Sequence, residues 1–216
     1  MALQMVHMEI AYRLIDKLDI TEGKEQFILG SVAPDSVHFR DPYLVEEKIH
    51  THLFEGCGTW SDTDDYDRWK SNIAEFRDKY AIKEPDPVKR AFLLGICVHC
   101  WTDYCNDVLV WRALQKKYIP QMTTQEFREN YYPEARLLDQ WLHQNSENTK
   151  EIMSLLEQSK PVDFEDYLRA EDIEKTKQHL LHVQYDVPKA DISGNKFYPK
   201  EMMTELIDAV VTDPML

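Results

Sequence analysis

Long hydrophobic runs are missing from this 216-residue chain. No stretch approaches the roughly 18 uninterrupted apolar residues that a membrane-spanning helix needs. The first residues, Met1 to His7, also lack the basic region and the apolar core that make up a secretory signal. We therefore predict no membrane span and a cytoplasmic location. The 43% hydrophobic content is still enough for a substantial core.

Cysteine is scarce and poorly placed for disulfides. Three of the four cysteines, Cys97, Cys100 and Cys105, fall on one predicted helix, where they cannot cross-link a fold, and Cys57 stands apart. The Cys97-x-x-Cys100 spacing is found in redox and zinc motifs, but no second pair accompanies it and no alternation of strands and helices surrounds it. We expect these cysteines to act as small packing residues.

Positive charge is also in short supply. The chain has 25 Lys and Arg against 39 Asp and Glu, a net charge of −14. Such a surface repels nucleic-acid backbones and anionic lipid head groups, so we expect no nucleic-acid binding by a basic surface. A small phosphorylated substrate remains compatible, because bound cations can reverse the field inside a cleft. The oligomeric state is left open.

Strand-like alternation is absent, and apolar residues instead recur at helical spacing. The fold class predicted is all-α: a single bundle-like domain, 1–216, built around a long central helix, with 161–216 as a possible peripheral C-terminal extension. Residues 35–45 are expected to form a loop, and Pro133 to kink or break its helix. The predicted helices are 6–18, 26–32, 66–80, 86–118, a segment from 123 through 141 toward 156, 172–183 and 199–211.

His99 and Asp103 stand four residues apart on the predicted central helix, so both side chains lie on one face. Gly95, one turn earlier, leaves space beside them. A buried imidazole next to a buried carboxylate calls for a charge partner, and a divalent metal supplies one. The alternative is a hydrogen-bonded His–Asp pair in an ordinary core, which this spacing alone does not exclude.

Further imidazole and carboxylate groups precede this pair. His7 begins the first helix, Asp35 follows Pro34 at a turn, and His50-Thr51-His52 comes about fifteen residues later. These are the ligand types that zinc and other borderline divalent ions select. Each also has an ordinary interpretation, as a surface histidine or a turn residue. His50 and His52 would point to different faces of a helix, so only one of them is expected to bind metal.

The order and context of these residues resemble the zinc-dependent phospholipase C family, which is related to the trinuclear-zinc single-strand nucleases. The resemblance covers roughly the first half of the chain. It is carried by four segments: His7 to Asp16, Gly30 to Asp35, Thr51-His52-Leu53-Phe54, and Phe92-Leu93-Leu94-Gly95 continued by His99 and Asp103. It selects His52 over His50. It implies one zinc ion, or another divalent metal, held by Asp35, His52, His99 and Asp103, and a second ion that shares Asp103 and takes His7.

The chain also departs from the family pattern. The family has a further His ten residues after the first on its central helix, and here that position is Leu109. His143 and Glu147 have the family's later HxxxE spacing but lie farther along the chain than the family expects, and a surface pair is the alternative. His50, His38 and Arg40 are candidates for contacts to the ligands or to phosphate. Asp107 is interpreted as a supporting or solvated carboxylate.

The resemblance implies a metal-dependent phosphoric-ester hydrolase, a phosphodiesterase or phosphatase acting on a small phosphorylated substrate. In this hypothesis a metal-activated water attacks phosphorus, and Asp35 is the catalytic carboxylate that orients it. The rival hypothesis is a non-catalytic metal-binding helical protein that retains only part of the site, which Leu109 favours. A phosphohydrolase with an adjacent His-Asp pair is a third possibility, but no His-Asp dipeptide occurs in the chain.

Overall fold

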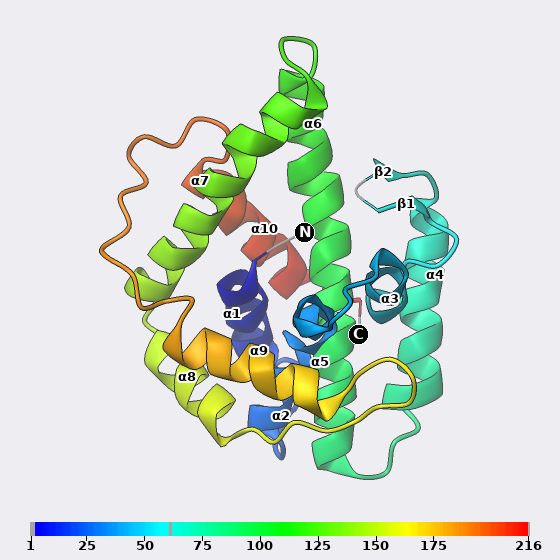
Figure 1. Ribbon diagram of the computed structural model, residues 1–216. Coiled ribbons are helices and arrows are strands. Elements are labelled where there is room, and N and C mark those ends of the chain that lie inside the picture. Colours follow the sequence, from blue (N-terminus) through cyan, green and yellow to red (C-terminus); the bar gives the residue numbers. More distant parts are fainter. Residues whose placement is uncertain (1–2, 61, 216) are drawn as a thin grey trace.

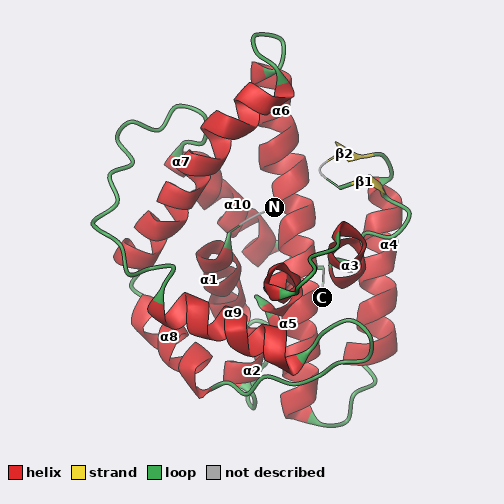
Figure 2. Ribbon diagram, in the orientation of Figure 1, coloured by secondary structure: helices red, strands yellow, loops and turns green. Residues whose placement is uncertain are grey.

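The computed structural model describes residues 3–60 and 62–215. Figures 1 and 2 show helices around one long central helix, with two short strands at one side. The fold is all-α, as predicted. In chain order the helices and strands are α1 (Gln4–Leu14), α2 (Lys24–Gly30), η1 (Ala33–Phe39), α3 (Val45–Thr51), β1 (Gly58–Thr59), β2 (Asp62–Thr63), α4 (Tyr66–Phe76), η2 (Arg77–Ala81), α5 (Pro87–Asn106), η3 (Asp107–Trp111), α6 (Arg112–Tyr118), α7 (Thr124–Asn145), α8 (Thr149–Gln158), α9 (Ala170–His182) and α10 (Lys200–Thr212).

The central helix begins as predicted. The Asp86 carboxylate accepts hydrogen bonds from the backbone N–H groups of Val88 and Lys89, and Pro87 occupies the first helical position. Every residue of α5 from 91 to 106 is buried. The helix continues through α6 to Tyr118, but one π-helical turn, η3, interrupts the regular α-helical pattern. This helix therefore passes through the middle of the molecule (Figure 1).

Two glycines allow α2 to cross α5 closely. A Cβ atom added to Gly30 would lie 2.1 Å from the carbonyl oxygen of Phe92, and one added to Gly95 would lie 2.4 Å from the carbonyl oxygen of Phe27. Any side chain at either position would push the two backbones apart. This contact brings the residues just after α2 against the turn of α5 that carries His99.

The remaining helices surround this crossing. The helices α7 and α10 pack on α1, α8 packs on α2, and α9 packs on η1. Side chains beyond residue 161 belong to the same hydrophobic core as the central helix: Phe164, Leu168, Ile173, Leu180, Met203, Leu206 and Val210. The C-terminal third of the chain is thus packed against the helices that carry the candidate site.

The structure corrects three predicted elements. Residues 35–45 are not a loop throughout, because Pro34 lies in the first turn of the 3-10 helix η1, where its missing N–H costs no hydrogen bond. Pro133 does not end α7. A proline has no N–H to donate, so the carbonyl of Glu129 loses its helical partner, but both residues are exposed and this carbonyl can bind water. The same helix stops at Asn145 instead of continuing toward Leu156, because Ser146 is extended, and α8 begins afresh.

Smaller differences occur elsewhere. The first helix ends at Leu14, a turn earlier than expected, and α3 and the hairpin of β1 and β2 were not predicted. Strands of two residues are too short to show alternation in the sequence.

Candidate metal centre

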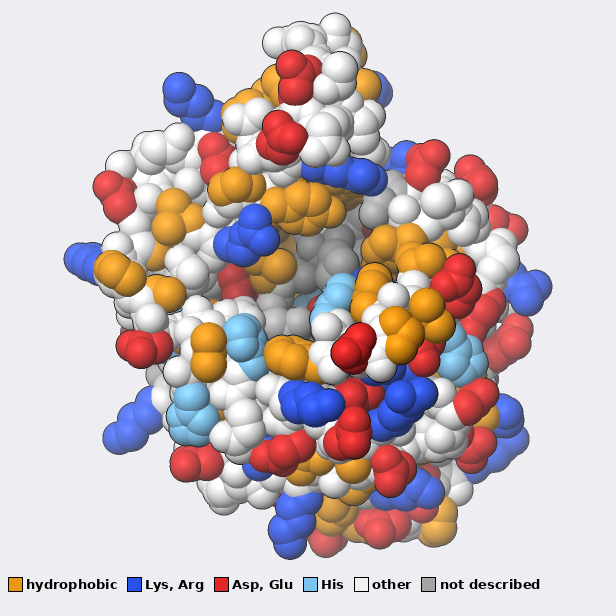
Figure 3. Space-filling view, viewed as in Figure 1, with side chains coloured by type: hydrophobic (Ala, Val, Ile, Leu, Met, Phe, Trp, Pro, Cys, Tyr) orange, Lys and Arg blue, Asp and Glu red, His pale blue; other side chains and the backbone are white. Residues whose placement is uncertain are grey.

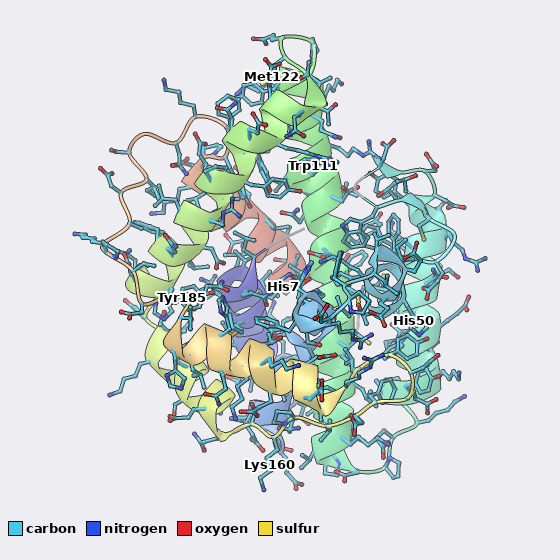
Figure 4. All side chains as sticks on the ribbon, viewed as in Figure 1. His7, His50, Trp111, Met122, Lys160 and Tyr185 are labelled. Atoms are coloured by element: carbon cyan, nitrogen blue, oxygen red, sulfur yellow. The ribbon has the colours of Figure 1, made fainter. Side chains whose placement is uncertain are left out.

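Five predicted ligands converge from four segments of the fold. His99 and Asp103 lie on α5, His7 on α1, Asp35 on η1, and His52 directly after α3. All five are buried. Figure 4 shows His7 in the interior, at the end of α1 that lies beside the central helix. Residues far apart in the sequence are therefore placed together where α1, η1 and α3 meet α5.

The polar atoms of these residues lie within a few ångströms of one another. The Nε2 atom of His52 is 3.2 Å from Asp35 Oδ1, 3.6 Å from Asp103 Oδ2 and 3.2 Å from His99 Nε2. His99 Nε2 is 3.8 Å from Asp103 Oδ2. On the other side of the same carboxylate, His7 Nε2 is 3.4 Å from Asp103 Oδ1. The two oxygens of Asp103 thus face different histidines.

Backbone carbonyls fix the orientation of two imidazoles. Nδ1 of His99 is 2.8 Å from the carbonyl oxygen of Ser31, the residue that follows α2. Nδ1 of His52 is 2.9 Å from the carbonyl oxygen of Lys48. Because a carbonyl oxygen only accepts, both Nδ1 atoms carry the hydrogen and donate it. In the neutral rings each Nε2 then presents its lone pair to the cluster, as in metal-bound histidines whose other nitrogen is held by a carbonyl.

Electrostatics favour the neutral rings. Burial, followed by the neighbouring His7, keeps the pKa of His99 well below its usual range. Burial and the Lys48 ammonium likewise lower the pKa of His52. The lone pairs of His52 and His99 and an oxygen of Asp35 consequently crowd together without a proton between them. The Lys48 ammonium compensates the charge of Asp35, but the facing lone pairs of His52 and His99 repel each other unless a further cation lies between them, so the residues fit a bound metal ion.

Two overlapping groups have ligand atoms close enough to hold an ion: Asp35, His52 and His99, and His7, His99 and Asp103. His99 has only one lone pair free of the backbone and can bind one ion. An ion bound by Asp35, His52 and His99 therefore has the larger number of ligands, because Asp103 can serve as its fourth ligand. His7 stacks on His99 with ring centroids 3.9 Å apart, and neither of its nitrogens makes a hydrogen bond. It is available as a ligand on the other side of Asp103.

Asp35 has a partner that the sequence did not point to. The Lys48 ammonium lies 2.6 Å from Asp35 Oδ1, and Gln4 donates a hydrogen bond of 2.8 Å to Asp35 Oδ2. Burial would raise the pKa of Asp35, but the Lys48 charge and the contacts with His38 and His52 together outweigh burial and hold that pKa well below its usual range. Lys48 precedes His52 by one helical turn on α3, and this spacing could have revealed it had α3 been predicted.

His7 is positioned by a carboxylate on another helix. Asp139 of α7 accepts hydrogen bonds from the backbone N–H groups of Met5 and Val6, at 2.9 Å and 3.3 Å, in the first turn of α1. The hydroxyl of Tyr185 also donates to Asp139, at 2.9 Å. These contacts satisfy N–H groups that a helix start leaves without partners, and they fix the end of α1 from which His7 reaches Asp103.

The residues suggested for contacts to ligands or phosphate divide into two kinds. His38 lies at the site, with its Nε2 2.7 Å from Lys48 Nζ and 3.5 Å from Asp35 Oδ1. Arg40 instead joins η1 to α9 through Asp172, at 2.8 Å, and also pairs with Glu47. His50 is away from the cluster, paired with Glu55 and stacked on Tyr167. Figure 4 labels His50 apart from His7, on the side of the molecule that holds α3 and α4.

The later predicted ligands are not brought to the cluster. His143 stacks on Tyr185 with ring centroids 4.1 Å apart, and Glu147 lines a separate cavity beside Glu9 and Arg13. In the described residues neither belongs to a group that could hold a metal ion. Leu109, on the π-helical turn η3, is 45% exposed and faces away from the core.

An aromatic cleft leads to the cluster. Asp103 and Asp107 lie in it together with Phe54, Trp60, Thr63, Trp69, Trp111 and Tyr132. Asp107 accepts hydrogen bonds from Tyr66, at 2.6 Å, and Thr63, at 3.1 Å, and so supports the wall of this cleft. Figure 3 shows the surface hollowed at the centre, with hydrophobic side chains along the rim. In Figure 4, Trp111 lies farther along the central helix than the level of His7.

The sequence matches a family model described as zinc dependent phospholipase C over residues 6–105. That segment contains the four stretches that supply all five converging ligands. Residues 6–105 belong to the zinc-dependent phospholipase C family.

Family membership and the buried cluster together support zinc as the metal of this site. The family match ends before Leu109, His143 and Glu147, the positions at which the chain departs from the expected pattern. No curated protein and no solved structure matches the chain. In the part of the chain that the structure describes, no helix is long and apolar enough to cross a membrane.

Proposed function

We propose that this chain is a metal-dependent phosphoric-ester hydrolase acting on a small phosphodiester or phosphomonoester. One observation carries the proposal: the Nε2 atoms of His52 and His99 lie 3.2 Å apart, facing each other and two carboxylates, beside an aromatic cleft. Buried groups that repel one another in this way are retained where a metal ion binds them.

Asp35, His52, His99 and Asp103 would hold the first zinc ion. A second ion would have only His7 and the other oxygen of Asp103 among the described residues, so it would bind more weakly. When bound, zinc supplies Lewis acidity, which makes water nucleophilic near neutral pH and draws charge from a phosphoryl oxygen.

In this proposal Asp35 orients the attacking water. Its carboxylate stays ionised because of Lys48, so it is a hydrogen-bond acceptor over the whole physiological pH range. A carboxylate with such a low proton affinity positions a water molecule better than it removes a proton from one. The buried His52 and His99 remain neutral, and their fixed Nδ1–H groups prevent them from rotating out of the site.

The walls of the cleft limit the substrate. Trp60, Trp111 and Tyr132 offer flat apolar surfaces to an organic group, while the cluster takes the phosphoryl end. The net charge of −14 argues against a nucleic-acid polymer as substrate. We also propose a cytoplasmic location, because all four cysteines are free and buried, as expected in a reducing compartment.

Elemental analysis combined with a panel of generic phosphoesters tests the proposal. The purified protein should contain zinc and hydrolyse 4-nitrophenyl phosphate or bis(4-nitrophenyl) phosphate. His99→Ala should lose zinc and activity together, whereas His182→Ala, at an exposed histidine outside the cluster, should keep both. Full activity of His99→Ala with zinc still bound would overturn the assignment.

A non-catalytic zinc-binding protein is the second candidate. The outward-facing Leu109 and the distant His143 favour it, because they leave the site with fewer ligands than the family pattern. Zinc bound at one ion per chain without turnover of any ester in the panel would select this candidate.

A further inference from the structure

A buried lysine lies in the candidate metal centre. Lys48, on α3, is 1% exposed, and its ammonium contacts Asp35 Oδ1 at 2.6 Å and His38 Nε2 at 2.7 Å. It also lies 5.2 Å from the centre of the Trp60 ring, and Trp60 lines the aromatic cleft. The ammonium is thus held between a proposed zinc ligand and the wall of the cleft.

A cation in this place works against metal binding. Lys48 shares Asp35 Oδ1 with the Nε2 atom of His52, so its charge lies close to the groups that would receive zinc. Like charges at such separations repel strongly in a buried environment. A lysine that only filled space could be replaced by an apolar side chain with a gain in metal affinity. The charge is therefore better explained by a negative group that enters the cleft.

The contacts of Lys48 leave a way for such a group to bind. The side chain of His38 is 44% exposed, and its imidazole nitrogen accepts one N–H of the ammonium. A phosphate oxygen is a stronger acceptor than a neutral imidazole, because its charge strengthens the hydrogen bond. An incoming phosphate can take this N–H while Asp35 continues to hold the ammonium in place.

We propose that Lys48 is a substrate-binding residue that donates a hydrogen bond to a phosphoryl oxygen, with His38 accepting the same N–H in the absence of substrate. The inference rests on the proposed hydrolase function for its substrate class. Leu109, His143 and Glu147 supply no further metal ligands to the site. Lys48 does supply a fixed positive charge there. It acts together with the zinc ligands on one phosphoryl group.

Binding of inorganic phosphate to the zinc-loaded protein tests this role without relying on turnover. Lys48→Met removes the charge at similar length, and Lys48→Arg keeps the charge. Lys177→Met is the matched control: Lys177 is another buried lysine, 7% exposed, whose ammonium donates to the Ser159 carbonyl outside the metal centre. Zinc content, the phosphate dissociation constant by calorimetry, and kcat and KM are measured for all four proteins.

We expect Lys48→Met to keep zinc at least as tightly as the original chain and to bind phosphate about 10- to 100-fold more weakly, the effect of one charge-assisted hydrogen bond. Its KM should rise with a smaller change in kcat. Lys48→Arg should be intermediate, and Lys177→Met should bind phosphate normally. Unchanged phosphate affinity in a zinc-loaded Lys48→Met protein would overturn the proposal and reduce Lys48 to a counter-ion of Asp35.

A second measurement covers the case in which Lys48→Met does not fold. In the original chain labelled with 15N-lysine, saturating phosphate should shift the Nζ resonance of Lys48, identified by its loss in Lys48→Arg, and should leave that of Lys177 in place. No shift would also overturn the proposal. Phosphate binding through Lys48 without hydrolysis of any ester would refute the hydrolase function alone. Hydrolysis with unchanged KM in Lys48→Met would refute only the role of Lys48.

Discussion

Gly95→Ala should damage the metal centre without touching a ligand. The added Cβ would lie 2.4 Å from the carbonyl oxygen of Phe27 and 2.8 Å from the Cα atom of Gly30, where ordinary contact begins at 3.4 Å. Relief requires α2 and α5 to separate by about 1 Å, since both obstructing atoms belong to the backbone. Overpacking of this kind costs about 1–3 kcal/mol.

The same displacement reaches the metal site. Ser31 follows Gly30 and accepts the 2.8 Å hydrogen bond from His99 Nδ1, so separating the helices lengthens or breaks this bond. Its loss adds about 1 kcal/mol and releases the orientation of the His99 ring. For a total loss of about 2–4 kcal/mol, we expect a fall in unfolding temperature of roughly 4–16 °C for a chain of this size and zinc binding weakened about 10- to 100-fold.

Calorimetric unfolding and competition with a zinc chelator measure the two effects. The control is Gly194→Ala, because a Cβ at Gly194 would meet no atom within 4 Å. The control should match the original chain in both assays. If Gly95→Ala unfolds at the original temperature and keeps its zinc affinity, the helices do not cross as closely as described, and the link between the crossing and His99 is wrong.

Three further predictions concern residues around the centre. Burial raises the pKa of Asp139 to about 6, above its unfolded value of about 4. Between these two values the folded state binds more protons than the unfolded state. The contribution of Asp139 to the free energy of unfolding therefore falls by about 1.4 kcal/mol per pH unit as the pH rises from about 4 to 6. Asp139→Asn should remove this slope in unfolding measured across that range, and an identical pH profile would contradict the assignment. Leu109→His should add no zinc in elemental analysis, because position 109 is 45% exposed; an extra bound ion would show that the side chain can reach the cluster. His143→Ala should leave zinc content unchanged, since His143 stacks on Tyr185, and a loss of zinc would place it among the ligands.

The central helix was predictable from the sequence because its signals are local. Asp86-Pro87 marks the start, and the i, i+4 spacing places His99 and Asp103 on one face whatever surrounds them. His7, Asp35 and His52 are different, because nothing local indicates that their segments meet. Their order and neighbours, through the family resemblance, supplied that information, and the structure places all five side chains together.

Other features could not be predicted because they depend on tertiary contacts. The contact of Lys48 with Asp35 depends on the way α3 packs on η1, and the spacing of Lys48 from His52 is informative only once α3 is known. The end of α7 at Asn145 is set by the extended backbone of Ser146, whose hydroxyl donates to Glu9 on α1. Helical spacing predicted one longer helix, because periodicity does not record where a distant carboxylate redirects the chain.

The π-helical turn η3 has a consequence for how relatives of this chain are to be compared. Such a turn arises from one residue inserted into a helix, and every side chain beyond it points about one position away from the direction an unbroken α-helix would give. Val110 is buried here, whereas Leu109 is exposed. In a comparison with a relative whose helix lacks this turn, positions past Asn106 that align in sequence would point in different directions.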